Sequence, residues 1–370
     1  MHKVNNNKHL TKKHNICIGS HKKQLLLFSL VHLILCYMAK IYKRLQMKKV
    51  IRNLMLILIS LSFSSCGILD SDSSSGNFSI YFLENTNLSY HDVCDSDINN
   101  LELKNTAWLT SDDIALYDFS VHYIYLNSNK SDFFSDYLDN GKIIFDFVTK
   151  PFVITTGTER IYLGSLMSSF SSIAYAGPSI MDFGVTYYPE DIIPIEYGTK
   201  ESDQRNDIRI KNALISDDLY HEGISVELTD VNILENSDTS TIQYTYSLRN
   251  NDSDDLYIFD SDIIGNEIFN YYSNGLVLKN DSTNSHIWAE YRNTDNSQWS
   301  QSWFSRINSG ESIERTITLK GYPRIPQLKY KCYFHFGTPK QIEKSERMID
   351  NTRIWIGRIE IEDYEFDYTE

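Results

Sequence analysis

The C-terminal part of the sequence contains a series of short segments in which apolar and polar residues alternate. Successive side chains of a β-strand point to opposite faces of a sheet, so a period of two residues predicts strands with one buried face. The clearest alternating segments are 224–228, 242–248 and 328–336, and clusters rich in Asn, Ser and Gly separate the segments at 250–252, 273–275 and 308–311. Such clusters favour turns. The pattern therefore predicts an antiparallel β domain.

Eight or nine strands of this kind follow one another in residues 208–370. Their number and spacing are typical of an antiparallel β-sandwich of immunoglobulin type. The phase of the last strand changes at Gly357-Arg358, between two pairs of isoleucines, which predicts a β-bulge there. We therefore expect a β-sandwich domain over residues 208–370.

Residues 78–198 show a mixed pattern. A strand is expected at Phe78–Leu83, and a turn at 156–158 joins two further strands into a hairpin. Thr110, followed by Ser111 and two aspartates, predicts a helix start, because a hydroxyl caps free N–H groups and carboxylates favour the first turn. We expect a small α+β domain here, with the charged segment 198–208 as its boundary. The predicted fold class is mainly β, with a small α+β N-terminal domain followed by an antiparallel immunoglobulin-like β-sandwich.

Residues 47–66 have the order of features found in a secretory signal peptide. Met47-Lys48-Lys49 and Arg52 form a basic head, and residues 54–61 form an apolar stretch that is too short to span a bilayer. Small residues then lead to Cys66. This order predicts export and cleavage near Cys66.

The motif Phe63-Ser64-Ser65-Cys66 resembles the lipobox of bacterial lipoproteins, with Phe63 where Leu is more usual. The resemblance implies that the signal peptide is removed and that Cys66 becomes a lipid-modified N-terminus carrying diacylglycerol and fatty acid such as palmitate. Two or three acyl chains hold a protein stably on a membrane, whereas one chain binds it marginally. The alternatives are a signal peptide with an incidental cysteine, or a short membrane anchor.

Residues 1–46 precede the predicted signal peptide and contain nine Lys or Arg and no acidic residue. A lipoprotein signal acts at the N-terminus, so we interpret this segment as a mis-called leader, with Met47 as the true start. The alternative is that Leu25–Ala39 is a membrane anchor. Its fifteen residues are short against the roughly 20 that a spanning helix needs.

Charge is distributed unevenly along the chain. Twelve of the 35 Lys and Arg residues precede Asp70, whereas all 49 Asp and Glu residues lie at or after it. The remainder therefore carries 23 basic and 49 acidic residues, a net charge near −26. A surface that binds nucleic-acid phosphates needs the opposite sign, so nucleic acid is excluded as a partner.

Residues 67–77 are mostly Ser, Asp and Gly and have little to bury, which predicts a flexible tether. Asp70 and Asp72, soon after the lipidated cysteine, resemble the surface-export signals of lipoproteins in the Bacteroidota. The resemblance implies a lipid-anchored location on the bacterial outer membrane or cell surface.

Two cysteines, Cys94 and Cys332, belong to the predicted domains. A disulfide between them fits an oxidising compartment, but two buried free thiols are the favoured interpretation. Cys332 shares the alternating apolar positions of 328–336, which places it on the buried face of a strand.

Motifs for catalysis and cofactor binding are missing from the sequence. It has no phosphate-binding loop and no nucleophile signature, and no two histidines have the spacing of a metal-binding pair. We expect single, partly exposed histidines, with His335 pointing outward, and predict no catalytic residue, cofactor or metal ion. The histidines after Cys66 are His91, His122, His221, His286 and His335.

Aspartates cluster on both sides of the short apolar run 256–259. Asp252, Asp254 and Asp255 precede it, and Asp260 and Asp262 follow. A hairpin would bring several carboxylates together, as Ca²⁺ requires, but the spacing matches no twelve-residue calcium loop. A solvated acidic turn is the favoured interpretation.

Trp288, Trp299 and Trp303 lie with Tyr291 in a Ser- and Asn-rich segment. An aromatic platform for a sugar or peptide is one interpretation. Packing against the core and at a sheet edge is favoured, since Trp303 fits a strand.

The sequence as a whole favours a non-enzymatic, membrane-tethered lipoprotein that binds or scaffolds a protein or glycan ligand through loops or a sheet edge. Two alternatives remain open. One is an envelope hydrolase with a carboxylate-based site in the α+β domain, and the other is a proteinase inhibitor that presents a loop from its sandwich.

Overall fold

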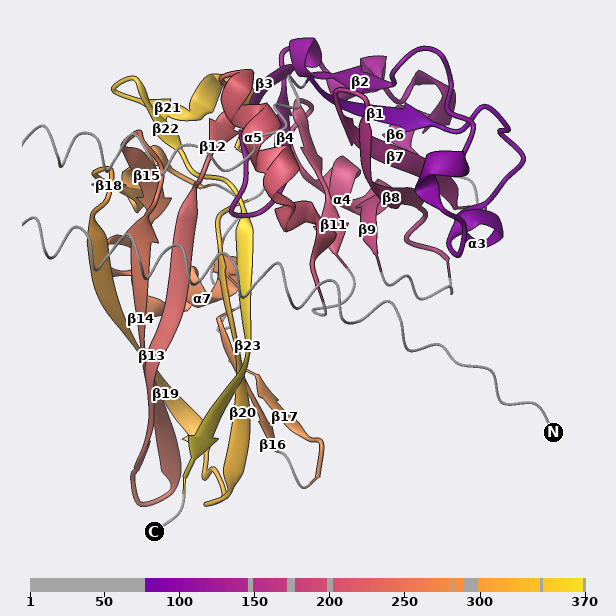
Figure 1. Ribbon diagram of the computed structural model, residues 1–370. Helices are drawn as coiled ribbons and strands as arrows, with labels where there is room; N and C mark the ends of the chain where they lie inside the picture. The colour runs from indigo at the N-terminus through magenta and orange to yellow at the C-terminus, as the bar shows by residue number, and fades with distance from the viewer. Residues whose placement is uncertain are drawn as a thin grey trace, which may run out of the picture. The chain divides into compact units, whose positions relative to one another are not determined.

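Figure 1 shows the computed structural model of the chain, which describes residues 77–145, 149–171, 177–197, 202–273, 275–280, 283–288, 299–339 and 342–368. The predicted leader, signal peptide, lipobox with Cys66 and nearly all of the tether lie outside the described residues. Residues Ser73–Glu370 form one compact unit. Within the described ranges, no helix is long and apolar enough to cross a membrane.

The described chain is mainly β, which confirms the predicted fold class at that level. Its strands form several sheets in which most neighbours are antiparallel. The division into two domains at 198–208 and the immunoglobulin type of the sandwich stay predictions. We refer below to residues 77–221 as the N-terminal region and to residues 224–368 as the C-terminal region.

The N-terminal region contains a six-stranded sheet in the order β11-β9-β8-β7-β1-β2. The predicted hairpin is confirmed, because β7 and β8 pair antiparallel around a turn in which Gly157 has a φ of 58°. Positive φ is the conformation that glycine adopts without steric cost. The strands are β1 (Phe78–Phe82), β2 (Leu109–Thr110), β7 (Lys150–Thr156), β8 (Glu159–Met167), β9 (Pro178–Met181) and β11 (Glu196–Tyr197).

A second sheet in this region has the order β10-β4-β3-β12. Strand β12 lies parallel to β3 and brings His221 beside Asp118, which positions the site described below. Its strands are β3 (Ile114–Asp118), β4 (Tyr123–Leu126), β10 (Ile192–Pro194) and β12 (Tyr220–His221). A two-stranded sheet joins β5 (Leu138–Asp139) to β6 (Lys142–Ile143).

Helices in the N-terminal region are short. The helix predicted to start at Thr110 is wrong: Thr110 and Asp113 do form a capping box, but a single 3₁₀ turn (Ser111–Asp113) runs directly into β3. Pairing of β3 with β4 outweighs the local helix signal. The α-helices are α3 (Tyr90–Val93), α4 (Asp182–Tyr187) and α5 (Ile208–Ser216), and the other 3₁₀ turns are η2 (Ile98–Asn100), η4 (Lys130–Asp132), η5 (Ser135–Tyr137) and η6 (Gln204–Asn206).

Helix α5 packs on the core of the N-terminal region. Its Ile210 and Leu214 are fully buried in the same cluster as Phe78 of β1 and Phe152 of β7. Full burial of side chains of this size stabilises the fold by about 1.5–3 kcal/mol each. Residues 208–221, which the sequence pattern placed at the start of the sandwich, thus contribute their apolar side chains to the preceding core.

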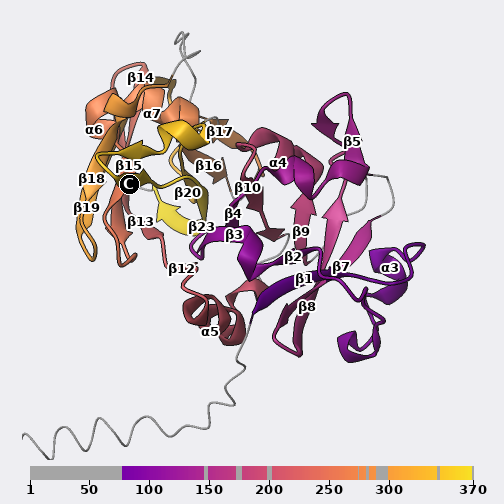
Figure 2. The same ribbon diagram turned by 90° about the horizontal axis from the view of Figure 1, so that it is seen from above.

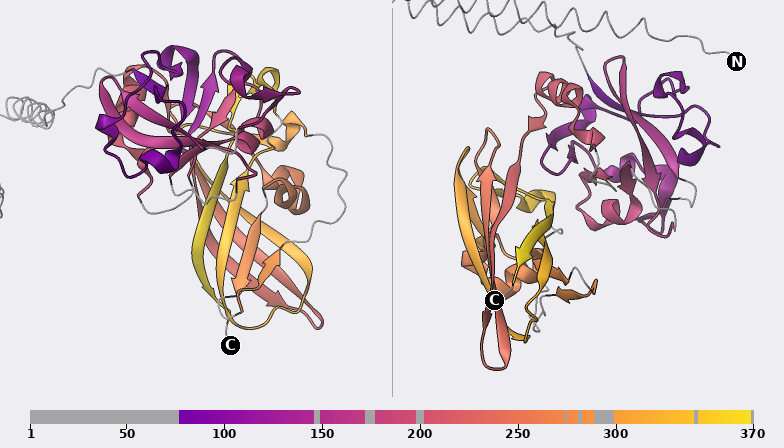
Figure 3. Two further views of the ribbon diagram at one scale, coloured as in Figure 1. Left: turned by 90° about the vertical axis from the view of Figure 1, so that its right-hand side faces the viewer. Right: turned by 60° about the horizontal axis from the view of Figure 1, so that its bottom comes forward.

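The C-terminal region contains three sheets with the orders β13-β14-β19, β17-β16-β20-β23 and β18-β15-β22-β21. Figures 1 and 3 show the long strands β13, β14 and β19 side by side. Their bounds are β13 (Ile224–Glu235), β14 (Thr239–Asn250), β15 (Leu256–Phe259), β16 (Leu276–Asn280), β17 (His286–Trp288), β18 (Phe304–Ile307), β19 (Ser312–Pro323), β20 (Lys329–Gly337), β21 (Met348–Ile349), β22 (Thr352–Ile354) and β23 (Arg358–Asp367).

Alternation places the apolar side chains of these strands in one core. Tyr244 and Tyr246 of β14 face Phe334 of β20, with ring centroids 5.4 and 5.2 Å apart. Cys332 is buried on the same face, as predicted. The β-bulge predicted at Gly357-Arg358 is wrong, because β23 begins there. The pairing of β23 with β20 does shift register, but opposite residues 332–334.

Two helices connect β15 to β16, and the strand pattern did not predict them. They are α6 (Ser261–Ile264) and α7 (Asn266–Ser273), which lie next to each other in Figure 2. Asp260 caps α6 by accepting a hydrogen bond from the Asp262 backbone N–H at 3.0 Å. Two further 3₁₀ turns are η7 (Gln301–Trp303) and η8 (Lys344–Glu346).

Candidate functional site

Residues 344–357 contact the N-terminal region through a set of polar side chains. Arg347 directly precedes β21 and Arg353 lies within β22. Both guanidinium groups lie over the ring of Tyr125, at 5.5 and 5.8 Å from its centroid. Trp355 Nε1 donates to Ser120 Oγ at 3.2 Å, and the Tyr125 hydroxyl donates to the Ile356 carbonyl at 3.2 Å. Residues 344–357 therefore join the two regions by polar contacts.

Arg353 is the centre of a charged cluster. Its two terminal nitrogens donate to Asp118 Oδ2 and Asp252 Oδ2, each at 3.1 Å. Burial alone would lower the pKa of Arg353, but the two carboxylates and the Tyr125 phenol act against it and the net shift is upward. Parallel pairing of β15 and β22 places Arg353 opposite Leu256, close to the turn that carries Asp252. Arg353 is thus held charged between two carboxylates.

His221 approaches the same turn from β12. Its Nδ1 lies 3.1 Å from both carboxylate oxygens of Asp252. Burial would raise the pKa of Asp252, but the hydrogen bond from His221, the charges of His221 and Arg353 and the Asp254 backbone N–H lower it, and the net shift is downward. Asp252 is therefore ionised at neutral pH.

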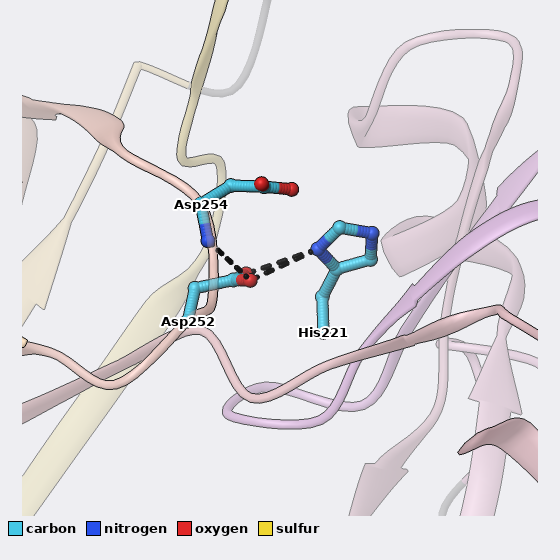
Figure 4. A group of neighbouring side chains, drawn as sticks. All are labelled: His221, Asp252 and Asp254. Atoms are coloured by element: carbon cyan, nitrogen blue, oxygen red, sulfur yellow. Dashed lines mark hydrogen bonds and ion pairs between the residues drawn. The ribbon is translucent and has the colours of Figure 1, made fainter. Parts of the chain in front are cut away.

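The cluster of His221, Asp252 and Asp254 is the group in the described chain that could hold a metal ion. One ligand atom from each residue lies within 4.8 Å of the other two. Figure 4 shows the imidazole and the Asp252 carboxylate facing each other, with the Asp254 carboxylate on the same side of the turn. The sequence analysis grouped Asp252 with Asp254 but did not connect them with His221, which lies 31 residues from Asp252.

Close packing at Gly223 keeps β12 beside the cluster. Gly223 has a φ of 70°, and a Cβ at this position would collide with Ser120 and Asp118. Ser120 Oγ in turn donates to Asp118 Oδ1 at 2.5 Å. A glycine is required here for both the backbone conformation and the space.

Arg347 forms a second buried ion pair. Its two terminal nitrogens donate to the two oxygens of Asp191, one of them at 2.8 Å, and both side chains are buried. Near this pair, Lys130 Nζ donates to the carbonyls of Val185, Tyr188 and Pro189. Burial lowers the pKa of Lys130 to about 8.

The prediction of a solvated acidic turn is wrong for Asp252 and Asp260, because each residue is only 2% exposed. Arg315 binds Asp260 with two hydrogen bonds of 2.8 Å, in the geometry typical of a bidentate arginine–carboxylate pair. Arginine partners supplied by distant strands make the burial of these carboxylates possible. Asp254 and Asp262 are exposed, as the prediction requires.

The histidines only partly follow the prediction of partial exposure. His91 and His286 are exposed, whereas His122 is buried beside Tyr117, with 3.2 Å between Nδ1 and the hydroxyl. Burial lowers the pKa of His122 to about 3. His122 also directly precedes β4 and has a φ of 57°. His335 does lie on the strand face opposite the core and interacts with Glu360 and Arg358.

Both cysteines of the described chain are free, and Cys332 is buried as expected. The prediction of burial is wrong for Cys94, which follows the short helix α3 and is exposed. Among the tryptophans, Trp299 and Trp303 pack against the core, as favoured, but Trp288 on β17 is exposed. Tyr291 lies outside the described residues.

An exposed aromatic cluster lies at α4. Phe183 and Tyr187 stack with their ring centroids 5.4 Å apart, and Phe183 and Phe170 are 58% and 78% exposed. Buried Asp182 ties the loop of Phe170 to α4 by accepting from Ser168 Oγ at 3.0 Å and from the backbone N–H groups of Ser169 and Phe183. We call Phe170, Phe183 and Tyr187 the α4 aromatic cluster.

A separate groove of about 630 Å³ lies along β19. It is lined by Asn266 and Glu267 at the start of α7 and by residues 318–322. Asn266 Nδ2 donates to the carbonyl of Thr318 at 3.0 Å. One backbone acceptor of the edge strand β19 is therefore hydrogen-bonded.

The arginines and their partners Asp118 and Asp191 were not predicted as functional or structural sites. One signal was present: Arg353 directly precedes the apolar run Ile354-Trp355-Ile356. A charged residue in such a run is buried only when it is paired, so a carboxylate partner elsewhere in the chain is implied.

No protein-family model matches this chain, and no curated protein matches it. Among solved structures, a crystal structure from Bordetella pertussis, described as that of a candidate ApaA protein, is similar to part of it. The similarity covers 40% of this chain and 92% of that chain, at 11% sequence identity and a TM-score of 0.20. A TM-score this low assigns neither fold nor function to the chain.

Proposed function

We propose that this chain is an envelope lipoprotein, anchored to a membrane through lipid on Cys66, that binds a protein or glycan ligand without catalysing a reaction. The sequence Phe63-Ser64-Ser65-Cys66 and the Ser- and Asp-rich tether after it support the anchor. On this proposal the acidic body stands away from anionic lipid on its tether and is located on the outer membrane or cell surface.

The observation that carries the binding role is the α4 aromatic cluster. Three aromatic side chains are exposed, two of them are stacked, and buried Asp182 holds their two segments together. Exposed aromatic groups of this kind are typical contacts for sugars and for protein partners. The cluster would therefore provide a ligand surface on a preorganised backbone.

The pairing of the buried carboxylates favours binding over hydrolysis. A hydrolase of the carboxylate type needs two carboxyl groups that exchange protons with a substrate or water. Asp118 and Asp252 instead share the guanidinium of Arg353, and Asp191 is paired with Arg347. Paired in this way, these carboxylates join the parts of the fold.

The anchor is tested by intact-mass analysis of the protein extracted from membranes. A chain that begins at Cys66 with added acyl mass supports the proposal, and Cys66→Ala should release the protein from the membrane fraction. A full-length chain that retains residues 1–46 would contradict the lipoprotein assignment and favour an anchor at Leu25–Ala39.

The ligand surface is tested separately on a glycan array and by cross-linking from a photoreactive phenylalanine analogue placed at position 183 in cells. We expect a saturable glycan signal that is lost in Phe183→Ser/Tyr187→Ser, or a discrete partner that is cross-linked from position 183 and is lost in Tyr187→Ser. The same analogue at Ile215, an exposed apolar position on α5, is the matched control. Equal labelling from both positions would contradict a specific ligand surface at α4.

A further inference from the structure

We propose that His221, Asp252 and Asp254 form a binding site for a divalent transition-metal ion of the zinc class. The proposal goes beyond the proposed function and does not depend on it. Its basis is the convergence of one imidazole and two carboxylates, drawn in Figure 4. Their ligand atoms all lie within 4.8 Å of one another. A mixed set of this kind differs from a purely acidic cluster because it contains a nitrogen ligand.

The spacing of the ligand atoms fits a coordination shell. His221 Nδ1 lies 3.1 Å from both oxygens of Asp252. Ligands bound about 2.1 Å from a metal ion are themselves separated by roughly 3.0 Å at octahedral angles and about 3.4 Å at tetrahedral angles. The separation of these two side chains, which is a hydrogen bond in the metal-free chain, thus also lies in the range that two ligands of one metal ion require.

The third ligand, Asp254, is exposed on the turn, and the turn is held by one buried side chain. Asn250 Oδ1 accepts from the Asp252 backbone N–H at 2.9 Å, and Asn250 Nδ2 donates to the Asp254 carbonyl at 2.8 Å. Asn250 is fully buried. The backbone under both carboxylates is thus held in place by Asn250.

The charge of the cluster also favours a cation. Asp118, Asp252 and Asp254 contribute three negative charges, and Arg353 contributes one positive charge. With a neutral imidazole, two negative charges remain. Arg353 binds Asp252 Oδ2 and leaves this carboxylate oriented toward His221, a role typical of groups that support metal ligands from outside the coordination shell.

The donor set selects the class of metal. Calcium and magnesium prefer oxygen ligands alone, whereas zinc and its neighbours bind imidazole together with carboxylate. Three protein ligands leave at least one coordination position for water or an external ligand. His221 would bind through Nδ1, so its proton would reside on Nε2.

The test is isothermal titration of the full-length chain, purified in detergent, with ZnCl₂. We expect one zinc ion per chain, and we expect His221→Gln and Asp254→Asn each to weaken binding by at least roughly tenfold. His286→Gln and Asp238→Asn are matched controls, because both residues are exposed and lie outside the cluster. The controls should bind zinc as the unchanged chain does.

Coordination is read out directly with Co²⁺, whose visible absorption reports its ligands. The spectrum should show a bound, low-symmetry ion in the unchanged chain and that of free aqueous Co²⁺ in His221→Gln. The absence of saturable zinc binding, or equal binding by His221→Gln, would overturn the proposal. Tighter binding of CaCl₂ than of ZnCl₂ would overturn the choice of metal class. Asp254→Asn keeps the test valid if His221→Gln fails to fold, because Asp254 is exposed.

Discussion

The two arginines at the β21–β22 hairpin differ in how their charge is balanced. Arg347 meets one carboxylate, Asp191, through both terminal nitrogens. Arg353 is shared between Asp118 of the N-terminal region and Asp252 of the C-terminal region, and Asp252 also contacts His221. Both guanidinium groups lie over the same ring, that of Tyr125.

We call the Arg347–Asp191 site the closed pair, and the cluster of Arg353 with Asp118, Asp252 and His221 the open network. The Arg347–Asp191 pair is neutral and bidentate, so each partner satisfies the other. The Arg353 cluster has more carboxylates than cations and ends at a partly exposed imidazole. We infer that the first pair acts in stability, whereas the second cluster retains capacity to respond to protons or metal ions.

The largest expected effect comes from breaking the closed pair. Arg347→Met should reduce the free energy of unfolding by about 3–5 kcal/mol, because it leaves Asp191 buried without a counter-charge. The measurement is chemical denaturation of the variant and the unchanged chain at neutral pH.

A double variant separates lost pairing from lost packing. Arg347→Met/Asp191→Leu removes both charges and should be more stable than Arg347→Met alone, because apolar groups of similar volume can replace a buried ion pair at little cost. If the double variant is instead less stable than the single one, the unpaired charge is not the source of the loss.

A smaller effect is expected in the open network. Asp252→Asn should cost about 1–3 kcal/mol, because Arg353 still has Asp118 as its counter-charge while one hydrogen-bonded group is lost. Asp191→Asn, which leaves Arg347 with no carboxylate partner, is the matched comparison and should cost more. Equal losses in the two asparagine variants would contradict the distinction between pair and network.

Acid titration sharpens this prediction. The pKa of Asp252 in the fold is below its ordinary value of 3.8, so the unfolded chain binds more protons than the folded chain between the two pKa values. Its contribution to stability is therefore present above about pH 4 and is lost as pH falls through the lower, folded pKa. Asp252→Asn should show a shallower loss of stability in acid than the unchanged chain.

The sequence predicted much of the C-terminal region because its long strands have one buried face. In β14 the buried residues alternate with less buried ones, as the pattern of Tyr244, Tyr246 and Leu248 indicates. The N-terminal region has strands that are short or buried on both faces, so alternation says less there about which face is buried. All four residues of β4 are buried, so β4 shows no alternation.

The charged cluster could not be assembled from the sequence for a different reason. His221 and Asp252 are 31 residues apart, and Asp118 and Arg353 are 235 residues apart, so no local spacing relates them. Only the parallel pairing of β3 with β12 and of β15 with β22 brings them together. The aspartates before β15 were recognised as a group, but their burial depends on arginines that local patterns do not specify.

The smallest expected effect is that of removing the imidazole. His221→Gln should change the free energy of unfolding by less than about 1 kcal/mol in metal-free solution, because the side chain is partly exposed and glutamine can still donate to Asp252. The measurement is chemical denaturation with a chelator present. A small loss would show that His221 contributes little to the stability of the fold. A loss as large as that of Arg347→Met would instead show that His221 is a structural part of the junction, and the contrast between the two arginine sites would no longer hold.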